Sequence, residues 1–150
     1  MGFKFGLETL LEIRTNKEEE SKRNFNKSQR ELQEKQLKKE DLLNQYEKYS
    51  GINKGESLVY QKLKKNYLFA LDKGISKIEQ DIEVKTKEVN YRREELKKKQ
   101  MERKTVDILK EKQYHQYITE ENRKEQIQND EFALYAYMRN IERRWNKWLI

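Results

Sequence analysis

The residue types that most often perform chemistry are scarce in this 150-residue chain and are not arranged for it. The single histidine, His115 in EKQYHQY, has no cysteine and no spaced carboxylates around it, as a metal site would need. The neighbouring carboxylates Glu94 and Glu95 fall on an expected exposed helix, without a pocket to shift their pKa values. No glycine-rich phosphate loop and no nucleophile–base arrangement is present. We therefore expect a non-enzyme without catalytic residues, metal or cofactor.

The composition favours long helices that bury only a narrow seam. Charged residues make up 41% of the chain, hydrophobic residues 34%, and there is no proline, which a helix interior tolerates poorly. The apolar start, MGFKFGLETLLEIR, is interrupted by Lys4, Glu8 and Glu12, so we expect neither a signal peptide nor a transmembrane segment. The net charge is +7, and basic and acidic residues are interspersed along the chain. We expect a cytoplasmic protein and no nucleic-acid partner.

Glycine and heptad spacing predict the elements. Gly51 and Gly55, in YSGINKGES, mark the only credible interior turn, and Gly51 is expected in the left-handed conformation after a helix end. We predict one all-α domain: helix 1 over about 4–50, a turn over 51–56, and helix 2 over 57–147. A coiled-coil seam is predicted in the second helix at seven-residue intervals: Leu68, Ile75, Ile82, Val89 and Leu96. The expected fold is an antiparallel coiled-coil hairpin whose second helix is longer and overhangs.

An antiparallel fold about Asn53 would pair residues whose numbers sum to about 106. Phe25 would then face Asp81, and Phe3 would face Arg103. The final ~45 residues of the second helix would overhang at 1.5 Å per residue. That overhang carries apolar residues, which predict a partner: Ile127, Phe132, Leu134, Met138, Ile141, Trp145 and Trp148.

Three segments together resemble the flagellar export protein FliJ family: FKFGLETLLEIR, YQKLKKNYLFALDKGI and ENRKEQIQNDEFALYAYMR. The resemblance covers nearly the whole chain. It implies a cytoplasmic, two-helix coiled-coil component of the flagellar type III export apparatus, similar to the central stalk of rotary ATPases. It further implies peripheral association with the inner-membrane export apparatus. The implied partners are the hexameric export ATPase FliI, the export-gate protein FlhA and export chaperones.

The resemblance also implies two sets of contact residues. The ATPase-facing set would be Leu7, Leu10, Leu11, Ile13 and Arg14 with Phe132, Met138 and Arg139. The gate-binding set near the turn would be Leu42, Tyr46, Tyr49, Tyr67, Leu71, Gly74 and Ile78. The tail WNKWLI is an extension without a family role.

Some alternatives stay open at this point. The chain could be a generic structural coiled coil that self-associates through its uncovered stripes, or an electrostatic nucleic-acid binder. Gly74 could reflect a close helix approach, a partner's side chain or tolerated drift. The tail could fray, anchor to a partner or touch a membrane surface.

Overall fold

The computed structural model describes residues 2–51 and 55–149, which form two long helices and, within those ranges, no strand. Helix α1 spans Glu8–Tyr49 and helix α2 spans Leu58–Trp148. The expected all-α fold with a longer second helix is confirmed. Helix α1 begins four residues later than expected, because the chain turns at Gly6 and Leu7, where the Glu8 amide donates to the Phe5 carbonyl at 3.3 Å.

The chain packs as two units. The hairpin unit is Glu12–Arg103, and the terminal unit combines Met1–Leu11 with Lys104–Ile150. The two helices cross from one unit into the other. The prediction of a single domain remains a prediction.

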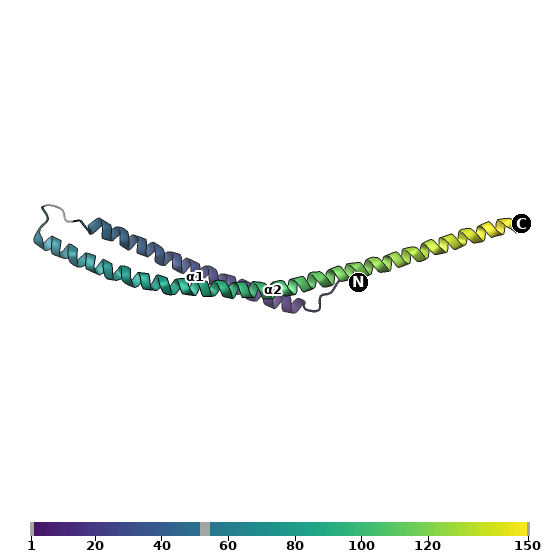
Figure 1. Cartoon of the computed structure of the whole chain (residues 1–150), viewed down its shortest axis with the longest axis horizontal. Coiled ribbons are helices and arrows are strands. Elements are labelled where there is room, and N and C mark those ends of the chain that lie inside the picture. Colours follow the sequence, from purple (N-terminus) through teal and green to yellow (C-terminus); the bar gives the residue numbers. More distant parts are fainter. Residues whose placement is uncertain (1, 52–54, 150) are drawn as a thin grey trace. The chain divides into compact units, whose positions relative to one another are not determined.

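In the hairpin unit, α1 and α2 lie side by side and antiparallel (Figure 1). Lys39 pairs with Glu79 at 3.3 Å, Lys35 pairs with Asp81 at 3.6 Å, and the Arg14 guanidinium donates to the Glu102 carbonyl at 2.8 Å. The paired residue numbers sum to 116–118 in these contacts. The expected register, with a sum of about 106, is therefore wrong. Phe25, for example, lies beside Arg93 rather than Asp81, with the guanidinium carbon of Arg93 5.7 Å from the centroid of the Phe25 ring.

The connection between the helices explains this register. A symmetric turn would place Leu58 beside Tyr49, but the Tyr49 ring packs against the Tyr67 ring, with centroids 5.4 Å apart. The Lys64 ammonium also donates to the Gly51 carbonyl, so Gly51, two residues after the end of α1, lies beside the second turn of α2. The first nine residues of α2 consequently extend past the end of α1 in the hairpin unit.

The interhelical seam is apolar near the connection and polar further along. Leu71, Ile75 and Val89 are buried, and none of the five predicted heptad residues of α2 is exposed. Toward the middle, the small side chains of Ser21 and Ser28 are buried instead. Ser28 donates to the Asn24 carbonyl at 3.0 Å. Ion pairs border this polar stretch, among them Glu18–Arg103 and Glu31–Lys85.

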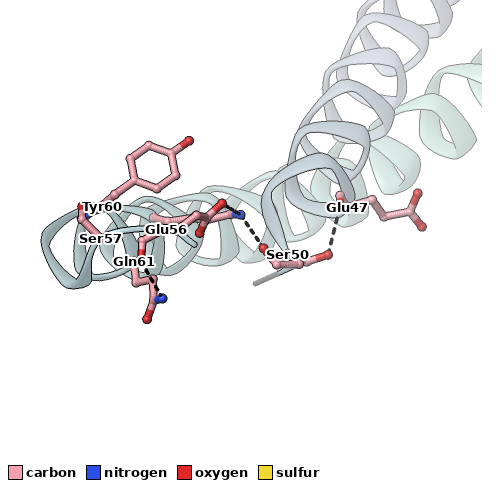
Figure 2. A network of polar contacts seen from close by, with 8 residues as sticks. Glu47, Ser50, Glu56, Ser57, Tyr60 and Gln61 are labelled. Atoms are coloured by element: carbon pink, nitrogen blue, oxygen red, sulfur yellow. Dashed lines mark hydrogen bonds and ion pairs between the residues drawn. The ribbon is translucent and has the colours of Figure 1, made fainter. Parts of the chain in front are cut away.

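Two serines define the helix ends at the connection (Figure 2). The Ser57 hydroxyl accepts a hydrogen bond from the Tyr60 amide at 3.1 Å and caps α2, as expected for an N-cap residue. The Ser50 hydroxyl donates to the Glu47 carbonyl at 2.9 Å and satisfies one free carbonyl at the end of α1. Among the described glycines only Gly55 has a positive φ, +97°. The expectation of a left-handed Gly51 is therefore wrong, because Ser50 closes the helix in its place.

This difference between the two glycines gives a matched prediction. Gly55→Ala should lower the free energy of unfolding by about 1–2 kcal/mol, because a Cβ is strained at positive φ. Gly51→Ala should leave it unchanged or raise it slightly, since a Cβ there meets no atom within 4 Å. Urea unfolding monitored by circular dichroism measures both. Equal effects of the two substitutions would contradict the assignment of a positive φ to Gly55 and not to Gly51.

In the terminal unit, the extended residues before α1 lie against α2 (Figure 1). Phe5, Leu11 and Val106 form a small buried core, with Phe3 and Leu10 packed on it. The Phe3 ring lies 5.4 Å from the Tyr114 ring and 5.6 Å from the Tyr117 ring, between centroids. Phe3 therefore reaches further along α2 than the expected partner Arg103.

The rest of α2 in the terminal unit is uncovered. From Thr119 to Leu149 every residue except Ile141 is exposed. The overhang is confirmed, but it begins at Thr119 and is shorter than the ~45 residues expected at 1.5 Å per residue. The shift in register accounts for this difference, because the amino-terminal residues cover α2 as far as Ile118.

Candidate interaction surfaces

The described residues offer no arrangement typical of a catalytic or metal site. His115 is exposed, and its Nε2 lies 3.9 Å from Glu111 Oε1, one helical turn away. Over residues 2–51 and 55–149, no group of three or more histidine, cysteine, aspartate or glutamate side chains could hold a metal ion. No helix in this part of the chain has the length and apolarity needed to cross a membrane. The sites that the sequence predicts are instead surfaces for partners.

The predicted gate-binding residues lie together at the end of the hairpin unit nearest the connection. Tyr67 contacts both Tyr49, edge to face, and Gln45, whose Oε1 accepts its hydroxyl at 3.2 Å. Leu71 is buried in the seam. Leu42, Tyr49, Gly74 and Ile78 are half-buried, which leaves Tyr46 and Tyr67 as the exposed members. Most of this set packs the two helices together.

A more exposed apolar group lies at the start of α2 and was not predicted as a gate contact. We call it the tip patch: Leu58, Val59, Tyr60 and Leu63, exposed by 83%, 71%, 48% and 62%. Figure 2 shows the Tyr60 ring pointing away from the helix. These residues extend past the end of α1, so α1 leaves them uncovered.

The sequence did carry a signal for the tip patch. Extending the two heptad series of α2 toward its start reaches Gln61 and Lys64, both polar. Leu58, Val59 and Leu63 fall on neither series, so they lie outside the seam. The assumed register obscured this signal, because it placed Leu63 opposite Leu43.

The surroundings of the tip patch are basic. Leu58, Leu68 and Tyr49 line an open hollow of about 470 Å³, whose border includes Lys62 and Lys65. Lys64 is largely buried there and pairs with Glu56 at 3.4 Å, which neutralises it. Lys62 and Lys65 are exposed. An apolar surface with lysines at its border favours a partner with apolar and acidic groups.

Gly74 has room for a side chain. A Cβ built on it would meet Leu42 Cδ1 at 3.8 Å, an ordinary van der Waals contact. A close approach of the helices therefore does not require glycine at this position.

We accordingly predict that Gly74→Ala raises the free energy of unfolding by about 0.5–1 kcal/mol, because glycine is unfavourable in a helix interior. The measurement is the urea midpoint. A lowered midpoint would show that the helices pack too tightly here for a methyl group. Ala70, exposed on the same helix, provides the reverse control, since Ala70→Gly should lower the midpoint by a similar amount.

The predicted ATPase-facing residues fall into separate places. In the terminal unit, Leu11 is buried in the core, Leu10 is half-buried and Leu7 is exposed. In the hairpin unit, Ile13 is exposed. Arg14 is half-buried there and is held by the Glu102 carbonyl.

The distal members of that set lie on the uncovered part of α2. Phe132, Met138 and Arg139 are all exposed. Val106, which packs with Leu11, precedes Phe132 on the same helix by a distance of roughly 39 Å at 1.5 Å per residue. The structure therefore does not bring the proximal and distal members of the terminal unit together. A single partner would have to contact the terminal unit at two places.

Hydrogen bonding shifts one carboxyl and one ammonium group in the hairpin unit. The hydrogen bond from Lys85 lowers the pKa of Glu31, and bonds to Glu31 and Glu88 raise the pKa of Lys85. Because the folded pKa of Glu31 lies below its ordinary value of 4.5, this pair stabilises the hairpin at neutral pH. The contribution of this pair to stability is lost as the pH falls below 4.5 and through the lower pKa that Glu31 has in the folded protein.

We predict that Lys85→Gln raises the pKa of Glu31 toward its ordinary value, measured by NMR titration of the carboxyl carbon. Lys87→Gln is the matched control, because Lys87 pairs with Glu83 on α2 instead. An unchanged Glu31 pKa in the Lys85 variant would show that the ion pair does not form in solution.

These features define a class of protein: an antiparallel helical hairpin with a narrow, partly polar seam and uncovered apolar residues on its longer helix. Searches of curated proteins and of solved structures return no match. The sequence model of the flagellar FliJ protein family matches residues 3–142. This chain belongs to the FliJ family, and it is thereby a component of the flagellar export apparatus. The family is a non-catalytic part of that apparatus.

Proposed function

We propose that this protein binds the hexameric flagellar export ATPase FliI, promotes its assembly and activity, and links it to the export-gate protein FlhA and to export chaperones. It acts in the cytoplasm, peripherally associated with the inner-membrane export apparatus. The observation that carries the proposal is the family match over residues 3–142, which includes most of the uncovered stretch of α2.

The uncovered stretch supports an ATPase contact. Between Thr119 and Glu142 its exposed apolar side chains include Ile127, Phe132, Leu134 and Met138. Exposed apolar residues at helical spacing are typical of a helix that docks against another protein. Leu7, exposed in the same unit, is the proximal residue best placed for a partner.

The tip patch supports a gate contact at the other predicted surface. Val59, Leu63 and Tyr67 are spaced by four residues on α2 and so share a face. Their exposure and the neighbouring Lys62 and Lys65 provide both apolar area and charge for recognition. The chaperone contact follows from the family resemblance alone.

Titration into the cognate ATPase tests the first contact. Micromolar protein should raise both ATP hydrolysis and the fraction of hexamer, and Met138→Asp should weaken both effects. Met101→Asp is the matched control, because Met101 is exposed but lies in the hairpin unit. No stimulation by the unmodified protein would refute the proposed function.

One observation favours a second candidate, a self-associating coiled coil. Ile127, Leu134, Ile141 and Trp148 repeat every seven residues along the uncovered stretch. Sedimentation equilibrium distinguishes the two: a stable dimer that does not stimulate the ATPase would favour self-association.

A further inference from the structure

The end of α2 differs in composition from the helix before it. Residues 143–149, which we call the tail segment, follow the last residue of the family match. They contain both tryptophans of the chain, Trp145 and Trp148, exposed by 66% and 87%. The family match therefore does not account for either tryptophan, and Trp148 is the most exposed aromatic residue of α2.

The apolar side chains of this region gather on one face. At 100° per residue, Ile141, Trp145, Trp148 and Leu149 fall within an arc of about 100°. Arg143 and Lys147 fall on the opposite side, and Arg144 falls beside the apolar arc. The last turns of α2 are thus amphipathic, although the helix as a whole is not.

The charge of the tail segment has one sign. It carries Arg143, Arg144 and Lys147 and no carboxylate side chain. Within the described residues, none of these three cations forms an ion pair. The stretch before it is different, because Glu120 pairs with Arg123 at 2.7 Å and Glu121 with Lys124 at 3.8 Å. The tail segment therefore presents three cations that its own helix does not neutralise.

The two indole rings and one guanidinium also shape the surface. Arg144, Trp145 and Trp148 line an open hollow of about 380 Å³. Indole rings favour the boundary between an apolar and an aqueous phase, and guanidinium groups bind phosphate. Lipid headgroups present this combination, with phosphates above an apolar layer.

We propose that the tail segment, with Ile141, binds the surface of a membrane containing anionic lipids. The helix lies in the plane of the surface, with Trp145, Trp148 and Leu149 at the headgroup level and Arg143, Arg144 and Lys147 near the phosphates. A second copy fits less well, because two tail segments would bring like charges together around two bulky indoles.

The chain provides its own reporter for the test. Since Trp145 and Trp148 are its only tryptophans, tryptophan fluorescence of the full-length protein, excited selectively over its nine tyrosines, reports the tail segment alone. With vesicles of phosphatidylcholine containing one quarter phosphatidylglycerol, emission should shift to shorter wavelength and iodide quenching should fall. Vesicles of phosphatidylcholine alone should cause much smaller changes, and added salt should reverse the binding.

Charge variants make the test specific. Co-sedimentation with the anionic vesicles should weaken about a hundredfold when Arg143, Arg144 and Lys147 are all changed to Gln, at about fivefold per cation. The matched control changes Lys98, Lys104 and Lys112 to Gln, three exposed lysines elsewhere on α2, and should bind as the unmodified protein does. The tail variant should still stimulate the ATPase. Loss of vesicle binding with stimulation retained therefore tests this proposal separately from the proposed function.

Several results would overturn the proposal. These are the absence of any spectral shift with anionic vesicles, and equal loss of binding in both triple variants. A shift that appears with rising protein concentration in the absence of vesicles would identify a second copy as the occupant. A shift that requires the ATPase and ignores vesicles would identify a protein partner.

Discussion

Replacing Val59 and Leu63 together by Asp is expected to raise the Kd for the cytoplasmic part of the export gate about 30-fold, which corresponds to about 2 kcal/mol. Both side chains are mostly exposed at the start of α2 and are one helical turn apart. The substitution removes apolar contact area and places carboxylates where a partner with acidic groups would bind. Isothermal titration calorimetry measures the change.

The fold should survive this double substitution. Neither side chain belongs to the seam, and a carboxylate at position 59, in the first turn of α2, is favourable because of the helix dipole. The far-ultraviolet circular dichroism and the Tm should therefore be unchanged. Val84→Asp is the matched control, since Val84 is 65% exposed on the same helix but lies away from the tip patch. An unaltered Kd in the double variant would remove the tip patch from the gate contact.

The second large effect concerns the small core of the terminal unit. Phe5→Ala should lower the free energy that holds the amino-terminal residues on α2 by about 3 kcal/mol, because a buried aromatic ring is lost. The Leu11 amide, which donates to the Leu7 carbonyl at 3.0 Å, should then exchange about a hundredfold faster with solvent. Hydrogen exchange followed by NMR measures this rate.

Two controls separate packing from partner binding. Phe132→Ala deletes the same ring from the uncovered stretch and should leave the Leu11 exchange rate unchanged. Leu7→Asp should also leave it nearly unchanged while weakening ATPase stimulation, because Leu7 is exposed. If Phe5→Ala had no effect on exchange, the amino-terminal residues would not be docked on α2 in solution. Leu11 would then be available to a partner.

The sequence by itself determined the helices. The absence of proline, the heptad series from Leu68 to Leu96 and the turn marked by Gly51 and Gly55 predict two helices that differ in length, and the structure contains them. These signals are local: they depend on side chains within a few turns of one another. The resemblance carried by three segments of the chain led to the family that the comparison confirms.

The tertiary structure alone decided the register. The seam of α1 is polar over Ser21, Ser28 and Lys35, so no strong apolar pattern fixes which residues of α2 lie opposite. The register instead depends on the packing of Tyr49 against Tyr67, on the Lys64–Gly51 hydrogen bond and on ion pairs such as Lys39–Glu79. Such contacts join residues far apart in sequence and leave no periodic signal.

The register in turn decided which apolar residues are covered. A shift of about ten residues, or roughly 15 Å along a helix, exposes the tip patch and extends the cover of α2 to Ile118. It also places Leu11 in a core with Val106, although Leu7, four residues earlier, stays exposed. The sequence determined that these side chains are apolar, and the packing of one helix against the other determined which of them a partner can reach.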